Sequence, residues 1–399
     1  MDLNKFAFHP MVWTLLLGTM FARGASFMAL PFLALYLSNT HGVHPILIGI
    51  TIGLSRLTGM FGGFIGGYLS DRFGRKVIML SSIFIWAFVY IGFSIADHIY
   101  VFMALNAVNG ICRSFFEPSS QALMADVTTQ ELKKRVFSLR YMAINIGAAV
   151  GPLIGVYVAK YNSTMPFFLT GCMYLLYAIT LVIMFSKFPV SRVTPVNQLK
   201  MMDAFQAIAK DRVLLLFILG GTFISFSYSQ IDSNLPQFIE QSFGDGISLF
   251  ATLIAINAII VVILQLPLGL LSEKWPVLRT VMIGSLLFAI GFGMFGFAST
   301  FTGLIAAMVI VTIGEIFIFP STSVFIDAIA PDGKRGTYFG ANQLQSLGGF
   351  AGPMIGGAIF SGFGGSVLFQ CIFFIVLFGC AFYAIGNKAM QKRSNVVSM

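Results

Sequence analysis

Long apolar runs, separated by short polar segments, cover almost the whole chain. A run of about 20 apolar residues has the length of an α-helix that crosses a lipid bilayer. Dividing the apolar segments by that length predicts twelve membrane-spanning helices, and the pattern therefore predicts an all-α membrane protein. The spans are expected near residues 11–38, 46–70, 77–96, 99–126, 136–159, 166–187, 213–240, 247–272, 277–298, 301–328, 336–361 and 366–386.

The composition agrees with this pattern and excludes a soluble protein. Of the 399 residues, 57% are hydrophobic and 10% are charged, and the mean hydropathy is +0.88. A soluble domain carries about 25% charged residues. The first apolar run is too long for the core of a cleavable signal peptide, so we interpret it as the first span.

The net charge of +9 follows membrane topology rather than a nucleic-acid binding surface. With the N-terminus in the cytosol, nineteen of the 24 Lys and Arg residues fall in cytosolic segments, and Lys160 is the one basic residue in the predicted outer loops. This distribution is the positive-inside rule. We therefore expect a multi-pass protein of the cell membrane with both termini in the cytosol and no nucleic-acid partner.

Cysteine and histidine residues give no indication of a metal site or a cofactor. The cysteines fall inside predicted spans without the spacing of metal ligands, and the histidines lie near span ends. The sequence also has no motif that would bring an acid, a base and a nucleophile together, so we do not expect the protein to be an enzyme. A membrane enzyme or a receptor is the disfavoured alternative. The residues are Cys112, Cys172, Cys371, Cys380, His9, His41, His44 and His98.

Four motifs in the first half of the chain recur 200 to 202 residues later. Gly67-Tyr-Leu-Ser-Asp71 returns as Gly269-Leu-Leu-Ser-Glu273, and Pro118-Ser-Ser returns as Pro320-Ser-Thr. A Lys-Arg pair and a Gly-x-x-x-Gly-Pro-x-x-Gly motif also return. Such matched halves predict two parallel six-helix bundles related by an axis along the membrane normal.

The longest polar stretch lies between these halves. It predicts an N-terminal six-helix bundle over residues 1–187, a cytosolic linker over 188–211 and a C-terminal six-helix bundle over 212–399. Residues 201–209 of the linker are expected to form a short amphipathic helix on the membrane surface.

A charged hairpin connects the second and third predicted spans, with the sequence Gly67-Tyr-Leu-Ser-Asp71-Arg72-Phe-Gly74-Arg75-Lys76. Gly67 allows another helix to approach closely. Asp71 can meet the positive N-terminus of a neighbouring helix, and Gly74 suits a tight turn. Arg75 and Lys76 are expected to anchor the loop on the cytosolic side.

This hairpin resembles the loop motif G-x-L-a-D-r-x-G-r-K of the major facilitator superfamily. The matched halves extend the resemblance over essentially the whole chain. It implies the major facilitator fold, with twelve transmembrane helices in two pseudo-symmetric six-helix bundles, and it implies that the hairpin acts as a conformational switch.

Predicted span five carries Gly147, Gly151, Pro152 and Gly155, which resembles a motif associated with antiporters. Small residues at four-residue spacing let two helices touch, and proline bends the helix, so packing alone is an alternative interpretation. Duplication could explain why the motif recurs from Gly348. On this resemblance the chain is placed near the twelve-helix drug:proton antiporter branch.

Seven charged residues inside predicted spans are candidates for a functional role, because a charge in the bilayer costs about 2.5 to 3.5 kcal/mol and usually faces a cavity or a partner. Arg113 and Glu117 are four residues apart and could pair on one face of span four. The arginine motif usual in span four of the superfamily is replaced by Asn106-Ala-Val-Asn109-Gly110, so Arg113 or Arg23 would take over its role. The seven are Arg23, Arg56, Arg113, Glu117, Arg140, Asp232 and Glu315.

Glu315, Asp232 and Glu117 are the candidates for proton coupling. A carboxyl group in a low dielectric can gain and lose a proton near neutral pH. Glu315 precedes Pro320 in span ten and resembles an acidic position of some multidrug antiporters; the alternative is a structural pair with an arginine. Asp232 lies in a polar part of span seven, or near the outer mouth, because Pro236 follows it.

The two halves differ in the charges within their spans. Among these seven candidates, the N-terminal half has four arginines and one acid, and the C-terminal half has two acids and no base. Arginines favour a carboxylate or phosphate on the cargo, and acids favour an ammonium group; the alternative is that they pair across the halves as gates. The substrate-cavity candidates are Arg23, Arg113, Arg140, Gln230, Asn257 and Gln343.

Together these observations favour a proton-coupled secondary transporter that exports small amphipathic molecules by alternating access. The first alternative is a dedicated exporter of an anionic or zwitterionic metabolite such as a metallophore, and an uptake symporter ranks third. The expected partners are the small-molecule cargo, protons and the lipid bilayer, and the expected state is a monomer without cofactor or metal.

Overall fold

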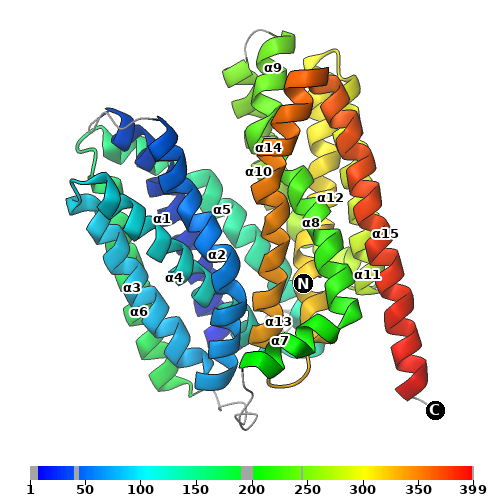
Figure 1. The fold of residues 1–399 in the computed structure, drawn as a ribbon. Coiled ribbons are helices and arrows are strands. Elements are labelled where there is room, and N and C mark those ends of the chain that lie inside the picture. Colours follow the sequence, from blue (N-terminus) through cyan, green and yellow to red (C-terminus); the bar gives the residue numbers. More distant parts are fainter. Residues whose placement is uncertain (1–7, 40–44, 190–200, 244–245, 398–399) are drawn as a thin grey trace. The chain divides into compact units, whose positions relative to one another are not determined.

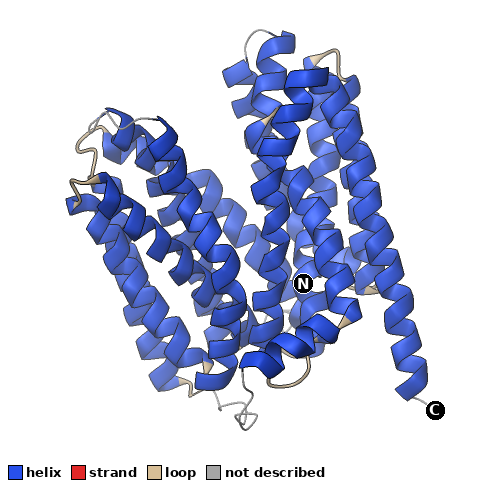
Figure 2. Cartoon of the chain, in the orientation of Figure 1, coloured by secondary structure: helices blue, strands red, loops and turns tan. Residues whose placement is uncertain are grey.

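The structure of the chain, a computed structural model, describes residues 8–39, 45–189, 201–243 and 246–397. His41, His44 and residues 190–200 of the predicted linker lie outside these ranges. The described residues are almost entirely helical and contain no strand (Figures 1 and 2). The predicted all-α fold class is therefore confirmed.

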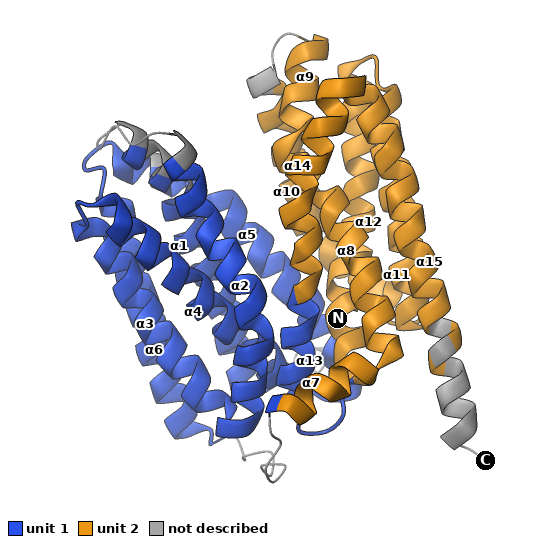
Figure 3. Cartoon of the chain, viewed as in Figure 1, with its two compact units in different colours: residues 1–201, 330–343 blue, residues 202–329, 344–399 orange. Residues whose placement is uncertain are grey.

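The chain divides into two compact units (Figure 3). Unit 1 consists of residues 1–201 and 330–343, and unit 2 of residues 202–329 and 344–399. Residues 330–343 thus pack with the first half of the chain, although they belong to the second half of the sequence repeat. The domain boundaries expected from the sequence stay a prediction.

The described residues of unit 1 form seven α-helices. Within it α1 packs on α5 and α6, α3 packs on α4 and α6, and α2 packs on α4 and α13. The helices are α1 (Pro10–Asn39), α2 (Pro45–Phe73), α3 (Arg75–Ile95), α4 (Ile99–Asp126), α5 (Lys133–Ala159), α6 (Met165–Lys187) and α13 (Arg335–Asn342).

Unit 2 repeats much of this arrangement. Within it α8 packs on α14 and α15, α11 packs on α12 and α15, and α10 packs on α12. These pairs correspond to those that α1, α3 and α2 make in unit 1, as the duplicated sequence motifs predict. The helices are α7 (Met201–Lys210), α8 (Arg212–Ser233), α9 (Leu235–Phe243), α10 (Gly246–Ser272), α11 (Val277–Phe297), α12 (Phe301–Ile329), α14 (Ser346–Phe363) and α15 (Gly365–Val397).

Two predicted spans are broken where the sequence predicted single helices. The span expected at 213–240 ends at Ser233, and α9 begins at Leu235 with Pro236 in its first turn. Proline lacks the N–H that a continuing helix would need there, but it suits the start of a new helix. The span expected at 336–361 is interrupted by a 3₁₀ turn over Gln343–Gln345. Eleven described helices remain long and apolar enough to cross a membrane.

The short amphipathic helix expected at 201–209 is confirmed as α7. Ala204 and Ile208 are buried on one face, while Met202 and Phe205 are exposed. The next helix begins directly after it, because the Asp211 side chain accepts hydrogen bonds from the backbone N–H groups of Val213 and Leu214, both at 3.1 Å. A side-chain acceptor at this position satisfies two of the free N–H groups of a helix start.

The duplicated glycine motif brings two helix backbones together in each unit. A Cβ on Gly147 of α5 would lie 2.6 Å from the backbone oxygen of Met20 on α1. In unit 2, a Cβ on Gly348 of α14 would lie 1.9 Å from the backbone oxygen of Thr222 on α8. In both copies the missing side chain allows the two helix backbones to lie in contact. This geometry supports the interpretation that the motif serves packing.

We expect that Gly147→Leu separates α1 from α5 and lowers stability, because the new side chain meets backbone atoms that cannot rotate away. Overpacking of this kind costs about 1–3 kcal/mol or more. Gly53→Leu on α2 is the matched control, because a Cβ there meets nothing within 4 Å. Thermal unfolding of the purified protein in detergent measures the difference, and equal melting temperatures for the two variants would contradict the expectation.

Candidate functional site

A small cavity lies inside unit 1, with residues of α1, α3, α4, α5 and α6 in its wall. Its volume is about 30 Å³, which is room for about two water molecules or one small polar group rather than a whole drug-sized ligand. Both charged and aromatic side chains face it. The lining residues are Thr19, Ala22, Arg23, Ser26, Trp86, Phe116, Glu117, Ser120, Arg140 and Tyr174.

Glu117 is the centre of an ion-pair cluster in this cavity. Its Oε1 accepts a hydrogen bond from Nη2 of Arg23 on α1 and, at 3.1 Å, from Nε of Arg113 one turn earlier on α4. The predicted pairing of Arg113 with Glu117 is confirmed. The side chains of Arg23 and Glu117 are 17% and 14% exposed, whereas that of Arg113 is 50% exposed.

Arg140 of α5 brings a third guanidinium to the same cavity. It interacts electrostatically with Glu117 and Tyr177. Its Nε is buried without a hydrogen-bond partner among the described residues. Glu117 is the one acid among the described lining residues, so three guanidinium groups surround a single carboxylate.

Aromatic side chains form a fixed wall of the cavity. Ser26 Oγ lies 2.8 Å from the Tyr174 hydroxyl and 3.1 Å from the Tyr90 hydroxyl. The Tyr174 ring lies 4.7 Å from the Trp86 ring, centroid to centroid, and Trp86 Nε1 donates to Asn109 Oδ1 at 2.6 Å. Sequence reasoning missed these residues, because contacts between helices so far apart in the chain leave no local pattern.

In unit 2, Glu315 lies fully buried in α12. Nδ2 of Asn257, on α10, donates to Oε2 of Glu315 at 2.7 Å and lies 2.9 Å from Oγ1 of Thr312. The Tyr228 phenol on α8 also lies against Glu315. The structure therefore joins a predicted proton-coupling acid to a predicted cavity residue, Asn257, within one hydrogen-bonded group.

The other predicted site residues are not among those that line the cavity of unit 1. Asp232 is exposed in the last turn of α8. Gln230 is buried, donates to the Phe226 carbonyl at 3.0 Å and accepts from Asn234 at 2.6 Å. Gln343 packs on α2, where a Cβ on Gly63 would lie 2.7 Å from it. Their roles in transport stay predictions.

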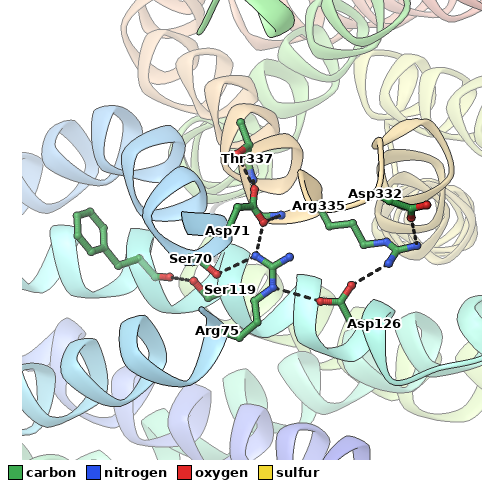
Figure 4. Close-up of polar contacts among 10 residues, drawn as sticks. Ser70, Asp71, Arg75, Ser119, Asp126, Asp332, Arg335 and Thr337 are labelled. Carbon is green, nitrogen blue, oxygen red and sulfur yellow. Dashed lines mark hydrogen bonds and ion pairs between the residues drawn. The ribbon is translucent and has the colours of Figure 1, made fainter. Parts of the chain in front are cut away.

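The hairpin motif binds the N-terminus of α13 (Figure 4). Asp71 Oδ1 accepts from the Gly336 N–H at 2.9 Å, and Oδ2 accepts from the Thr337 N–H at 2.6 Å and its hydroxyl at 2.5 Å. Gly67 permits the contact, since a Cβ there would lie 2.0 Å from the Gly336 oxygen. The expectation that Asp71 meets a helix N-terminus is confirmed.

Arg75 lies at the centre of this contact and is buried. It forms an ion pair with Asp71 and donates to Ser70 at 2.9 Å and to Asp126 at 3.2 Å. Arg335 of α13 reaches the other oxygen of Asp126 at 2.8 Å (Figure 4). Arg75 is thus held inside the protein, where the nearby carboxylates compensate its charge, and the expectation that it keeps the loop on the cytosolic side stays a prediction.

The remaining hairpin residues shape the turn. Gly74 is the single residue between α2 and α3. It has a φ of +95°, a conformation that glycine adopts without strain. Arg72 donates to the Tyr68 hydroxyl at 2.9 Å and lies over the Phe73 ring. Lys76 is exposed at the start of α3.

Several known proteins resemble this chain along most of its length. An MFS-type transporter of Bacillus subtilis (strain 168), YqjV, is 36% identical over 96% of this chain and 95% of the relative. The Na⁺, Li⁺, K⁺/H⁺ antiporter of Planococcus maritimus is 27% identical over 83% of this chain and 84% of its own. The multidrug resistance protein MdtH of Aeromonas salmonicida (strain A449) is 24% identical over 87% of both chains.

A solved structure and a family model match the chain in the same way as these relatives do. The crystal structure of the human organic anion transporter MFSD10 (TETRAN) matches with a TM-score of 0.74 at 17% identity, over 94% of this chain and 100% of the other. The family model described as Major Facilitator Superfamily matches residues 15–353 and 235–394. The chain is thus a multi-pass membrane transporter that belongs to the major facilitator superfamily.

Proposed function

We propose that the chain is a proton-coupled antiporter that exports small amphipathic molecules by alternating access, in the cell membrane and with both termini in the cytosol. The observation that carries the proposal is Glu315, a carboxyl group fully buried in α12 and held by the Asn257 amide. Burying an ionisable group inside a membrane span is costly, so such residues usually have a function. The neutral amide and the Tyr228 phenol can bind either its protonated or its charged form.

The relatives favour exchange over uptake. One is named as a cation/proton antiporter and another as a multidrug resistance protein. The glycine motif of α5, which resembles that of antiporters, packs directly on α1. The names of the relatives and the resemblance of the motif support export driven by proton entry, whereas the packing itself fits export and uptake equally.

The hairpin supports alternating access. α13 is held in unit 1 by Asp71 and Arg75, and the chain connects it directly to α12 and α14 of unit 2. Hydrogen bonds to a charged group contribute about 1.5–3 kcal/mol each. A contact of this size can hold one state of the cycle and still break within it, as a conformational switch requires.

A second candidate, a dedicated exporter of an anionic or zwitterionic metabolite, is favoured by the cavity of unit 1. The arginines that line it, Arg23 and Arg140, and the neighbouring Arg113 suit a carboxylate or phosphate. Uptake by symport has no specific observation in its favour and ranks third.

Transport by the purified protein in liposomes of known orientation tests the proposal. A pH gradient is imposed, and a lumenal dye reports proton movement while cationic, neutral or anionic amphipathic compounds are added. Proton flux opposite to the compound supports the antiporter. Proton flux in the same direction as the compound would overturn it.

A further inference from the structure

The charges in the cavity of unit 1 do not balance. Arg23, Arg113 and Arg140 approach Glu117, so the cluster has a formal charge of +2. Unbalanced charge in a membrane protein is costly and usually marks a ligand path or partner. The partner that this cluster would accept is an anion.

Two of the guanidinium groups have donors to offer. Arg113 uses Nε for Glu117, and its side chain is 50% exposed, which leaves its terminal nitrogens accessible. Arg140 has a buried Nε without a hydrogen-bond partner among the described residues. A guanidinium presents parallel N–H groups that match the two oxygens of a carboxylate or phosphate.

The size of the cavity limits which part of a ligand it can hold. At about 30 Å³ the cavity holds one polar group and no more, while Trp86, Phe116 and Tyr174 face it. These three side chains are themselves buried, Trp86 and Phe116 at 5% and Tyr174 at 2% exposure, so they form a rigid wall around the acidic group, and the rest of the ligand lies outside the cavity. A cationic head group in the same place would meet the guanidinium groups of Arg23 and Arg140, and like charges at short range strongly disfavour binding.

We propose that this cluster binds the acidic group of the cargo, so that the transported compounds are amphipathic anions or zwitterions with a carboxylate, phosphate or sulfonate. The acidic group takes the free donors of Arg113 and Arg140. It competes with the Glu117 carboxylate, because both are anions that the same guanidinium groups attract and that repel each other. The inference rests on the proposed transport of small amphipathic molecules, and it names their class.

The test is equilibrium binding to the full chain in uncharged detergent, measured by calorimetry without any gradient. The probes share one ring system and differ only in charge: naphthalene-2-carboxylate, naphthalene-2-carboxamide and 2-naphthylmethylammonium. We expect the carboxylate to bind at least about tenfold more tightly than the other two, since a charge-assisted hydrogen bond is worth about 1.5–3 kcal/mol. Equal binding of the three probes would overturn the inference.

Two substitutions of opposite expected effect separate a binding site from a structural ion pair. Arg113→Gln should weaken the binding of naphthalene-2-carboxylate about tenfold or more. Glu117→Gln should strengthen that binding by a similar factor, because the competing carboxylate is gone. Arg56→Gln is the matched control, since Arg56 is an exposed arginine of α2 that, unlike Arg113, is not among the arginines that interact with Glu117. Weakening by Glu117→Gln to the same extent as by Arg113→Gln would overturn the competition.

An anionic lipid head group has the same chemistry as an acidic cargo, so the titration is repeated with phosphatidylglycerol present. Unchanged binding of naphthalene-2-carboxylate supports a cargo site. Loss of that binding at low lipid-to-protein ratio would assign the cluster to a lipid and overturn the cargo assignment. Because no gradient is used, binding can succeed while proton-coupled transport fails, which keeps the two proposals distinguishable.

Discussion

Glu315→Gln is expected to reduce proton-driven transport to the level of protein-free liposomes while leaving the protein folded. Glutamine has nearly the same shape and can still meet the Asn257 amide and the Tyr228 phenol. It cannot bind and release a proton, so cargo movement is no longer coupled to the gradient. Dye-monitored proton flux in liposomes measures the loss.

A second assay separates lost coupling from lost transport. Exchange of labelled for unlabelled cargo at equal pH on both sides needs no net proton movement, so Glu315→Gln is expected to retain it. Glu240→Gln, the same chemical change at an exposed position of α9, is expected to behave like the wild type in both assays. Wild-type proton flux in Glu315→Gln would exclude Glu315 as the coupling group.

The length of the apolar runs was sufficient to predict the helices, because every run of about 20 apolar residues must satisfy its backbone hydrogen bonds within the bilayer. What it did not predict were the breaks at Asn234 and at Gln343–Gln345. Hydropathy averages over a window and does not register one proline or a short group of amides. The prolines inside α4, α5 and α12 do not end their helices, so proline alone does not identify a break.

The candidate site was predictable only within single helices. The i, i+4 spacing of Arg113 and Glu117 gave their ion pair directly. The contact between Arg23 and Glu117 joins residues 94 positions apart, and helix periodicity carries no information about which helices become neighbours. Asp71 was expected to meet a helix N-terminus, but the sequence did not show that α13, 265 positions later, supplies it.

Asp71→Asn is expected to release the N-terminus of α13 from unit 1. Both Asp71 oxygens act as acceptors, Oδ1 toward Gly336 and Arg75 and Oδ2 toward Thr337. An asparagine places an NH₂ donor against one of these groups of donors, and it leaves Arg75 with less compensating charge. Breaking a buried pair by removing one partner costs about 3–5 kcal/mol. The Asp71 side chain is only 5% exposed, so little screening by water is expected.

Hydrogen–deuterium exchange over residues 335–342 measures this release, because the Gly336 and Thr337 amides lose their acceptor and should exchange faster. Asp332→Asn is the matched control: Asp332 lies 3.7 Å from Arg335 but is 97% exposed, and an exposed ion pair of this kind contributes little. Because Asp71 does not line the cavity of unit 1, Asp71→Asn should change turnover without changing which compounds are transported. Unchanged exchange at residues 335–342, or an altered cargo profile with normal turnover, would show that the hairpin does not hold α13 as a switch.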